Sequence, residues 1–203
     1  MRVVIIDYGL GNPSSIKNMF KKIGCYAEIT NNKEIINDAS HIVLPGVGHF
    51  KKGMELLSEL DLINVLEKKV LVDEIPFLGI CLGMQLLSVH SEEGDCDGLG
   101  WIEANTIKFE FNDASVKIPH MGWADIAVKK QNLLFNNLEE NARFYFVHAY
   151  HIVCEKKELI IADATYSENF CAAVQFKNIF GVQFHPEKSH KYGMQLLKNF
   201  AAL

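Results

Sequence analysis

The sequence predicts an α/β fold: a single three-layer domain over residues 1–203, with a mainly parallel central sheet and additional antiparallel strands. Up to Gly94, short apolar runs rich in β-branched residues alternate with amphipathic segments, which indicates parallel strands covered by helices on both faces. After Gly94, β-like segments with short connections dominate. The length of 203 residues, 49% of them hydrophobic, suits one domain with a sizeable core.

The first half contains the clearest strand and helix signals. Residues 2–7 (RVVIID) form a buried apolar run that predicts the first strand. Residues 13–24 begin with Pro and Ser, carry apolar residues at helical spacing and end at a glycine, which predicts a helix. The other expected strands of this half are 26–30, 41–46 and 76–80, and the other expected helical regions are 50–72 and 83–90.

The second half predicts strands, some of which are expected to pair antiparallel, and one closing helix. Residues 189–202 place Met194, Leu197 and Phe200 on one helical face. The β-like segments are 101–111, 114–119, 124–130, 143–153, 159–166, 170–178 and 179–184.

Composition excludes several classes of function. The net charge is −5 and no basic stripe is present, which disfavours a nucleic-acid partner. No apolar run approaches the ~20 residues of a membrane-spanning helix, so no membrane partner is expected. The N-terminal segment MRVVIIDYGLGN is typical of a first strand rather than of a signal peptide.

The five cysteines are odd in number and form no CxxC pair. This pattern disfavours a disulfide framework and a thiolate zinc site, so we expect a cytoplasmic protein without a metal site. No cofactor is expected either. Four of the cysteines are expected to act as small buried apolar residues, namely Cys25, Cys96, Cys154 and Cys171.

Cys81 differs because it lies between Gly79 and Gly83, directly after an apolar strand. The pattern matches the nucleophile elbow G-x-S-x-G, with sulfur in place of oxygen. Such a turn strains its central residue and brings strand and helix close together, which requires small neighbours. An exposed sulfur over a helix N-terminus is favoured as thiolate, and the N–H of Leu82 faces an oxyanion formed there. A buried cysteine in a glycine-containing turn is the alternative.

His185 is the histidine best placed to serve as a base for this thiol. It ends the last strand, Pro186 stiffens the turn that follows, and Glu187 can hold the Nδ1–H of the imidazole. Since Cys81 and His185 both end strands at the same predicted edge of the sheet, they form a candidate nucleophile and base.

The other histidines predict no chemistry by themselves. His148 and His151 form H-x-x-H on an expected strand, whose period of two places them on opposite faces and disfavours a shared metal. The remaining ones are interpreted as ordinary strand, helix or surface-loop residues: His41, His49, His90, His120 and His190.

The sequence resembles the class I glutamine amidotransferases, on the motifs GICLGMQ (79–85), PGVG (45–48) and GVQFHPEKS (181–189). More narrowly, it resembles the glutaminase subunits of imidazole glycerol phosphate synthases. The segments that carry this likeness are spread along the chain: DYGLGN (7–12), PGVGHF (45–50), SEEG (91–94), GLGWI (98–102), PHMGW (119–123) and FYFVHAYH (144–151).

The resemblance implies a Cys81–His185–Glu187 triad that hydrolyses L-glutamine to glutamate and ammonia through a γ-glutamyl thioester. It also implies an oxyanion hole made by Val47, Gly48 and Leu82, with glycines that allow a peptide flip. The substrate-binding residues implied in the same way are Gly46, Gln85, Glu93, Tyr145, His148 and Ala149.

The resemblance further implies a partner. The glutaminases of this family deliver ammonia through a tunnel to a synthase, which in the nearest family is a (β/α)8-barrel cyclase bound as a heterodimer. Asn12, Trp123 and Lys188 match positions at the docking face. Two positions depart from the family pattern: Ala124, where Asn is usual, and Pro13, where an aliphatic residue is usual.

These departures leave more than one function open. The first interpretation is the glutaminase subunit for histidine biosynthesis. The second is a paralogous glutaminase that supplies ammonia for amidination or amination of a surface sugar. A peptidase-like cysteine hydrolase and a non-catalytic binding module are further alternatives, which the intact Cys81, His185 and Glu187 and the absence of a histidine after Cys81 disfavour.

Overall fold

The strands of both halves of the chain join in one large sheet, whose members are β1 (Val3–Ile6), β2 (Ala27–Thr30), β3 (His41–Gly46), β4 (Phe77–Cys81), β8 (His120–Val128), β9 (Arg143–His148), β11 (Ile160–Tyr166), β12 (Glu168–Phe176) and β13 (Ile179–Val182). In this computed structural model, which describes residues 2–113 and 115–203, their order is β2–β1–β3–β4–β13–β12–β11–β8–β9. The strands from β2 to β13 are parallel to their neighbours, and those from β13 to β9 pair antiparallel. The predicted mixed sheet is therefore confirmed.

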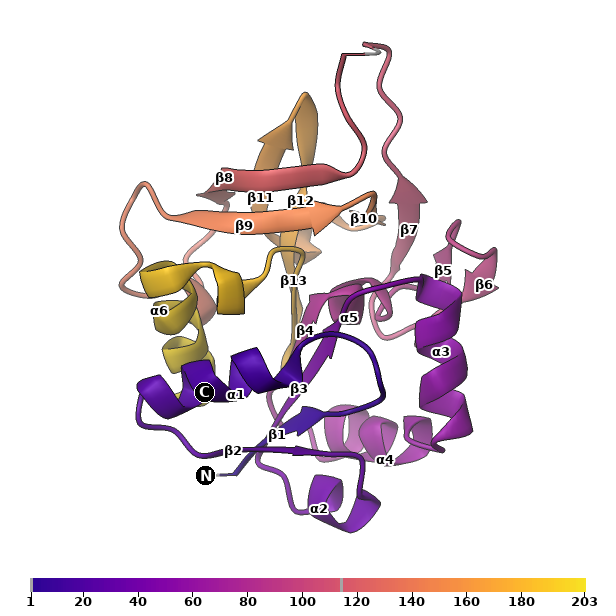
Figure 1. Ribbon diagram of the computed structural model, residues 1–203, viewed down its shortest axis with the longest axis vertical. Helices are drawn as coiled ribbons and strands as arrows, with labels where there is room; N and C mark the ends of the chain where they lie inside the picture. Colours follow the sequence, from indigo (N-terminus) through magenta and orange to yellow (C-terminus); the bar gives the residue numbers. More distant parts are fainter. Residues whose placement is uncertain (1, 114) are drawn as a thin grey trace.

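A smaller sheet stands beside the first. Its strands are β5 (His90–Ser91), β6 (Cys96–Asp97), β7 (Ala104–Lys108) and β10 (Tyr150–Cys154), in the order β10–β7–β5–β6. It lies on the side of the large sheet that also carries helix α3 (Phe50–Glu59), as Figure 1 shows.

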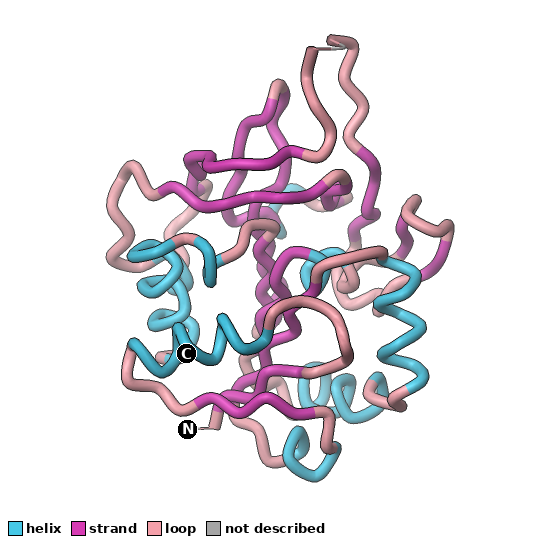
Figure 2. The backbone as a smooth tube through the Cα atoms, viewed as in Figure 1, coloured by secondary structure: helices cyan, strands magenta, loops and turns pink. Residues whose placement is uncertain are grey.

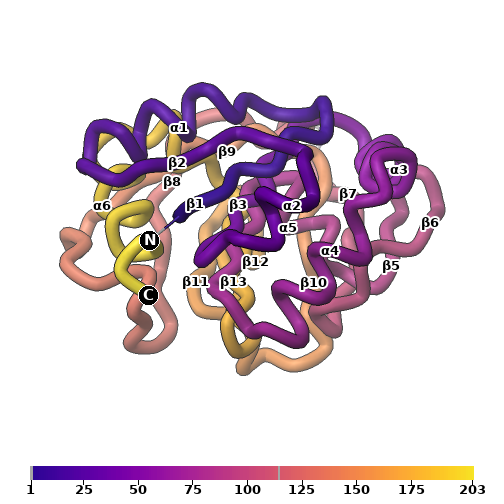
Figure 3. Tube along the Cα trace, turned by 90° about the horizontal axis from the view of Figure 1, so that it is seen from below, coloured from indigo at the N-terminus to yellow at the C-terminus, as the bar shows by residue number. Residues whose placement is uncertain are grey.

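Helices cover both faces of the parallel strands because the strand residues alternate between two cores. Val3 and Ile5 pack in one cluster with residues of α1 (Pro13–Lys22) and α6 (His190–Ala201). Val4 and Ile6 pack in the other, with residues of α3 and α4 (Ile63–Glu67). Figures 1 and 3 show α1 and α6 on one side of the strands and α3 and α4 on the other, and Figure 2 shows the strands as the central layer.

Shorter helical elements complete the chain. They are α2 (Lys33–Asn37), α5 (Leu82–Gln85), a π-helical turn at Lys68–Val72 and 3-10 turns at Leu133–Phe135, Lys157–Leu159 and Pro186–Lys188. Among the described residues, no helix has the length and apolar character needed to cross a membrane.

The start of α1 follows the sequence signals. The Asn12 side chain accepts a hydrogen bond from the Ser15 N–H at 3.1 Å, and Pro13 occupies the first helical turn, where no N–H acceptor is needed. Gly24 follows the helix with a φ of +77°, a conformation that favours glycine. The predicted helix over 13–24 is confirmed.

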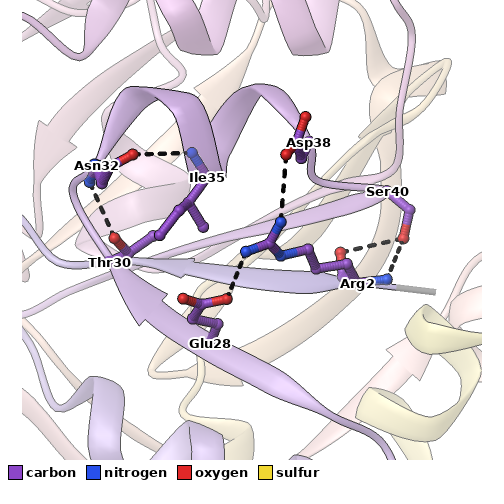
Figure 4. A network of polar contacts seen from close by, with 7 residues as sticks. All are labelled: Arg2, Glu28, Thr30, Asn32, Ile35, Asp38 and Ser40. Atoms are coloured by element: carbon purple, nitrogen blue, oxygen red, sulfur yellow. Dashed lines mark hydrogen bonds and ion pairs between the residues drawn. The ribbon is translucent and has the colours of Figure 1, made fainter.

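Polar contacts fasten the N-terminal strand to its neighbours (Figure 4). The Arg2 guanidinium lies 2.9 Å from Glu28 on β2 and 3.5 Å from Asp38 after α2. The Ser40 hydroxyl accepts from the Arg2 N–H at 2.8 Å and donates to the Arg2 carbonyl at 3.1 Å. These contacts hold β1 and the edge strand β2 together. Their residues are distant in sequence from the candidate catalytic residues.

Three sequence predictions of secondary structure are wrong. The helix expected over 83–90 ends at Gln85, because the Ser88 hydroxyl donates to the Gln85 carbonyl at 2.8 Å and Val89 donates to Ala104 at 2.9 Å. Residues 115–119 form no strand: Asp113 accepts from the Ser115 N–H in a turn, and Pro119 has no N–H to pair. Residue 114 of that segment lies outside the described residues.

The third concerns the segment 143–153, expected as one strand, which divides at Ala149. Before this residue β9 pairs with β8, and after it β10 pairs with β7 of the smaller sheet. The Ala149 carbonyl accepts from the Phe109 N–H at 3.0 Å at the point of division. The region 50–72 is likewise divided, into α3, α4 and the π-helical turn, with Asp61 at a φ of +50° between the first two.

Candidate active site

The candidate site lies where β3, β4 and β13 end. These strands are neighbours in the sheet and run parallel, so their carboxyl ends share one edge. Gly46 at the end of β3 is paired in register with Cys81 at the end of β4, and Val182 on β13 is paired with Ile80. His185 follows β13 by three residues, and the fold thereby brings the predicted nucleophile and base to the same edge.

Cys81 has the strained backbone that the glycine pattern predicts. Its φ is +54° and its ψ is −110°, outside the ordinary helix and strand regions. A Cβ on Gly79 would lie 2.5 Å from the Gly83 carbonyl oxygen, and a Cβ on Gly83 would lie 1.9 Å from the Leu44 carbonyl oxygen. No side chain fits at either position, so the two glycines are required by the close approach of β3, β4 and α5.

The surroundings of Cys81 differ from the prediction in two respects. The residue is only 5% exposed, whereas an exposed sulfur was expected, and the buried Gln183 side chain contacts its sulfur. The helix that follows has only four residues, so it supplies first-turn N–H groups rather than the dipole of a long helix.

Backbone hydrogen bonds hold the loop that carries His185. The His185 N–H donates to the Tyr145 carbonyl on β9 at 2.8 Å. The Ser189 hydroxyl donates to the His185 carbonyl at 2.6 Å and accepts from the Tyr145 N–H at 3.0 Å. The imidazole is therefore positioned by the antiparallel half of the sheet, while Cys81 is positioned by the parallel half.

The His185 side chain lies between Cys81 and Glu187. Its Nδ1 is 2.8 Å from Oε1 of Glu187, and the two side chains are 1% and 4% exposed. Burial lowers the pKa of His185, but its interactions with the Cys81 sulfur and the Glu187 carboxylate outweigh burial and raise the pKa from 6.5 to about 10. A protonated imidazole is thus favoured beside the sulfur at neutral pH.

The PGVG segment presents free backbone donors next to Cys81. Val47 is 47% exposed, and Gly48 has a φ of +129°, a conformation that other residues rarely adopt. Within residues 2–113 and 115–203, neither the Val47 nor the Gly48 N–H has a hydrogen-bond acceptor. With Leu82 at the first position of α5, these groups are available for an oxyanion, which is the role predicted for them.

Gln85 lies inside the site rather than on a helix surface. It is 4% exposed, and its Nε2 donates to the Tyr150 carbonyl at 2.8 Å and to Oε1 of Gln183 at 3.1 Å. Gln183 in turn donates from Nε2 to the Cys81 sulfur at 3.7 Å. Sequence reasoning missed Gln183, although its place two residues before His185 in GVQFHPE was the available signal.

Glu93 and Ala149 have backbone partners. The Glu93 carboxylate accepts from the Phe50 N–H at 2.8 Å, which fixes the segment SEEG against the start of α3, two residues after the end of PGVG. The Ala149 carbonyl is occupied by Phe109. Their roles in substrate binding, like that of Gly46, stay predictions.

His148 is buried behind the site. Its Nδ1 donates to the Tyr150 carbonyl at 2.8 Å, and burial lowers its pKa to about 3, so the ring is neutral. The expectation that His148 and His151 face opposite ways is wrong: both rings lie against Phe109, with centroids 5.2 and 4.4 Å away, because the chain changes sheets between them. His120, interpreted as a loop residue, is also buried, begins β8 and stacks on Tyr166.

The described residues contain no group of three or more His, Cys, Asp or Glu side chains able to hold a metal ion. All five cysteines are free thiols.

Two of the predicted docking residues lie near the Tyr145 ring. Lys188 is exposed and its Nζ lies 5.4 Å from the Tyr145 ring, while the half-exposed Trp123 ring lies 6.1 Å from the same ring. Asn12 caps α1 at the end of the first loop. That loop touches the PGVG segment, since a Cβ on Gly11 would lie 3.2 Å from Gly46 Cα.

Tyr8 of the same loop is a second residue that sequence reasoning missed. Its ring is 1% exposed, its hydroxyl has no partner among the described residues, and a Cβ on Gly46 would lie 2.4 Å from that hydroxyl. Burial and the nearby Cys81 sulfur both raise its pKa, which keeps it a neutral donor. A tyrosine at the end of a first strand carries no signal for such a position.

Comparison with solved structures supports the fold. The chain superposes with a TM-score of 0.75 on a PurLQS structure from Thermotoga maritima, covering 99% of this chain and 97% of that one at 18% identity. It superposes with a TM-score of 0.64 on a glutamine amidotransferase from Thermotoga maritima, covering 100% of this chain and 83% of that one at 18% identity. At this identity the likeness concerns the fold alone.

Comparison of sequences is more specific. The family model described as glutamine amidotransferase class-I matches residues 4–203. The chain is 54% identical to imidazole glycerol phosphate synthase subunit HisH 2 of Methanococcus maripaludis, over 98% of both chains. It is 44% identical to HisH 2 of Pseudomonas aeruginosa, over 99% of both, and 45% identical to HisH 1 of Campylobacter jejuni, over 99% and 100%. The chain therefore belongs to the class I glutamine amidotransferase family, among relatives named imidazole glycerol phosphate synthase subunit HisH.

Proposed function

We propose that this chain is the glutaminase subunit of an imidazole glycerol phosphate synthase, which hydrolyses L-glutamine and passes the ammonia to a synthase partner in histidine biosynthesis. The observation that carries the proposal is the position of the buried His185 between Cys81 and Glu187, at an edge where the Val47 and Gly48 N–H groups have no acceptor among the described residues. The HisH names of relatives that span the whole chain support the pathway.

The first half of the reaction forms a thioester. The Cys81 sulfur attacks the side-chain amide carbon of glutamine, and the negative oxygen of the tetrahedral intermediate accepts hydrogen bonds from the N–H groups of Leu82 and of PGVG. The His185 imidazolium gives its proton to the amide nitrogen, the carbon–nitrogen bond breaks, and ammonia leaves. The γ-glutamyl group then remains on sulfur.

The second half restores the enzyme. His185, now neutral, takes a proton from a water molecule, whose oxygen attacks the thioester carbonyl. The tetrahedral intermediate expels the Cys81 thiolate, and glutamate is released. Glu187 holds the Nδ1–H throughout, which fixes the imidazole orientation and leaves Nε2 for the proton transfers.

The neighbours of the triad suit the rest of the substrate. Gln85 uses its nitrogen for protein acceptors, which leaves its oxygen to accept from the α-ammonium group of glutamine. We propose that Glu93, Tyr145, His148, Ala149 and Gly46 complete this pocket.

The proposed partner is a (β/α)8-barrel cyclase, docked on Asn12, Trp123 and Lys188 to form a heterodimer in the cytoplasm. The contact between the first loop and PGVG, through Gly11 and Gly46, supports coupling between docking and the oxyanion donors. The glycines around Val47 allow its peptide to rest in either orientation, so partner binding can complete the hole.

The test is the steady-state rate of glutamine hydrolysis by the chain alone, with the cyclase, and with the cyclase plus its acceptor nucleotide. We expect slow hydrolysis alone and a rate about 10²–10³-fold higher with partner and acceptor, the usual value of one oxyanion donor. Full activity in the isolated chain, unchanged by partner and acceptor, would contradict the coupling. No hydrolysis under any condition would contradict the glutaminase assignment.

A second candidate keeps the chemistry and changes the acceptor to a surface sugar. Ala124 and Pro13, which depart from the family pattern near the docking face, favour it. In the structure Pro13 begins α1 beside Asn12, and Ala124 follows Trp123 on β8. Identification of the synthase that co-purifies with the chain from its own organism separates the two candidates.

A further inference from the structure

Gln183 contacts the sulfur of the candidate nucleophile from a fully enclosed position. The residue is 0% exposed, and its Nε2 lies 3.7 Å from the Sγ of Cys81. Its backbone N–H donates to the Ala172 carbonyl at 2.9 Å, which holds the residue in line with β13. The side chain therefore reaches Cys81 from the direction of β13, apart from the first-turn N–H groups of α5.

The direction of the Gln183 amide follows from its neighbours. A backbone carbonyl only accepts hydrogen bonds, so the contact with Tyr150 requires that Gln85 presents its NH2 group there. The same NH2 group lies 3.1 Å from the Gln183 side chain, which must then present its oxygen. The Gln183 NH2 group is left facing the sulfur. An ionised sulfur has no proton to donate, so in this contact it is the acceptor and the NH2 group is the donor.

We propose that the Gln183 amide is a hydrogen-bond donor that stabilises the Cys81 thiolate, and that Gln85 positions it for this role. The proposal rests on the assignment of Cys81 as the nucleophile of the proposed function. A hydrogen bond to an ionised acceptor is stronger than one between neutral groups, and exclusion of water strengthens it further.

The donor acts at two points of the reaction. Before the Cys81 sulfur attacks glutamine, the Gln183 amide and the His185 imidazolium both favour the thiolate form of Cys81 over the thiol. In the second half it stabilises the thiolate that leaves the tetrahedral intermediate. Because the sulfur of the thioester carries no charge, the hydrogen bond is strongest in the ionised states. Gln85 connects this donor to the substrate pocket.

The experiment measures alkylation of Cys81 by iodoacetamide as a function of pH in the full chain, quantified on the peptide that contains Cys81. Gln183→Met removes the donor at nearly constant volume. We expect its alkylation midpoint to rise by about one pH unit or more, because a hydrogen bond to a charged group is worth that much. Gln195→Met on α6, whose side chain donates to Asn199 at 2.8 Å, is the matched control and keeps the wild-type midpoint.

Gln85→Met gives an independent measurement if Gln183→Met does not fold, because it leaves the donor in place and removes its anchor. We expect a smaller rise of the midpoint. If Gln183→Met folds, an unchanged alkylation midpoint in that variant overturns the proposal. If Gln183→Met does not fold, an unchanged midpoint in Gln85→Met overturns it. Neither glutamine nor partner is present in the reaction, so an unreactive Cys81 in the wild-type chain would instead contradict the proposed function.

Discussion

Nδ1 of His185 lies 2.8 Å from Oε1 of Glu187, which is two positions further along the chain. Both side chains are almost fully enclosed. The 3-10 turn that begins at Pro186 brings the carboxylate back under the imidazole. Because Nδ1 is engaged, Nε2 is the ring nitrogen left without a partner among the described residues. Substitution of either residue can separate the effect of this pair on the turnover number from its effect on glutamine binding.

Glu187→Gln keeps a side chain that can accept the Nδ1–H but removes the charge. We expect the turnover number to fall within the roughly 10²–10⁴-fold range of positioned acid–base catalysis, with little change in KM. His185→Ala should lose more, because it removes the proton carrier itself. Steady-state kinetics with the synthase present measure both variants. Complete loss of glutamine binding in Glu187→Gln would indicate a substrate contact instead.

Cys81→Ala should abolish glutamine hydrolysis without unfolding the chain, because alanine is smaller than cysteine and adds no atom to this crowded turn. A glutamine-like diazo ketone should label Cys81 and spare the other four thiols, which lie outside the Cys81–His185–Glu187 set. Peptide mapping by mass spectrometry checks the labelling. Substantial glutaminase activity in Cys81→Ala, or a label on Cys25 or Cys171, would refute the triad.

His148 should make the fold sensitive to acid. Its pKa is about 3 in the folded chain against 6.5 in the unfolded chain, so the stability that it supports is present above pH 6.5 and is lost as the pH falls toward 3. At pH 4 the loss is on the order of 3 kcal/mol. His148→Phe, in a pocket already lined by Phe109, Phe146 and Phe170, removes the titrating group.

The measurement is the free energy of unfolding in urea at pH 7 and pH 4. His148→Phe should lose about 3 kcal/mol less than the wild-type chain between these pH values. His49→Gln, at an exposed loop histidine, serves as the control and should follow the wild type. Equal losses in His148→Phe and the wild type would exclude His148 as a source of acid sensitivity.

Gly83→Ala should strongly destabilise the chain, because its Cβ would lie 1.9 Å from the Leu44 carbonyl oxygen, where backbone must move. We expect a loss of several kcal/mol or no folded protein, since overpacking typically costs about 1–3 kcal/mol even against side chains. Gly53→Ala on α3 is the contrasting variant: its Cβ would meet only the terminal carbons of leucines, at 3.2 Å or more. Thermal unfolding compares them, and equal midpoints would contradict the clearance argument.

Much of the fold could be predicted because the signals are local. The capping of α1 by Asn12 and Pro13 and the apolar runs of β1, β3 and β4 depend on neighbouring residues, and the structure confirms these elements. The helix expected after Cys81 ends early because Val89 pairs with Ala104, a partner that no local pattern reveals. The division of segment 143–153 has the same cause, since two different sheets compete for one apolar run.

The residues of the candidate site also fall into those that the sequence predicts and those that only the tertiary structure reveals. Cys81 between two glycines, and His185 followed by Pro186 and Glu187, are readable because strain and short-range hydrogen bonding act within a few residues. Gln183, Tyr8 and the enclosure of Cys81 were decided by tertiary structure. The amide of Gln183 meets the sulfur across 102 positions of chain, and the Tyr8 hydroxyl occupies the space that a Cβ on Gly46 would need, past the ends of the adjacent strands β1 and β3. Such contacts depend on which strands lie next to each other in the sheet. The periodicity of residues along the chain carries no information about that spatial order.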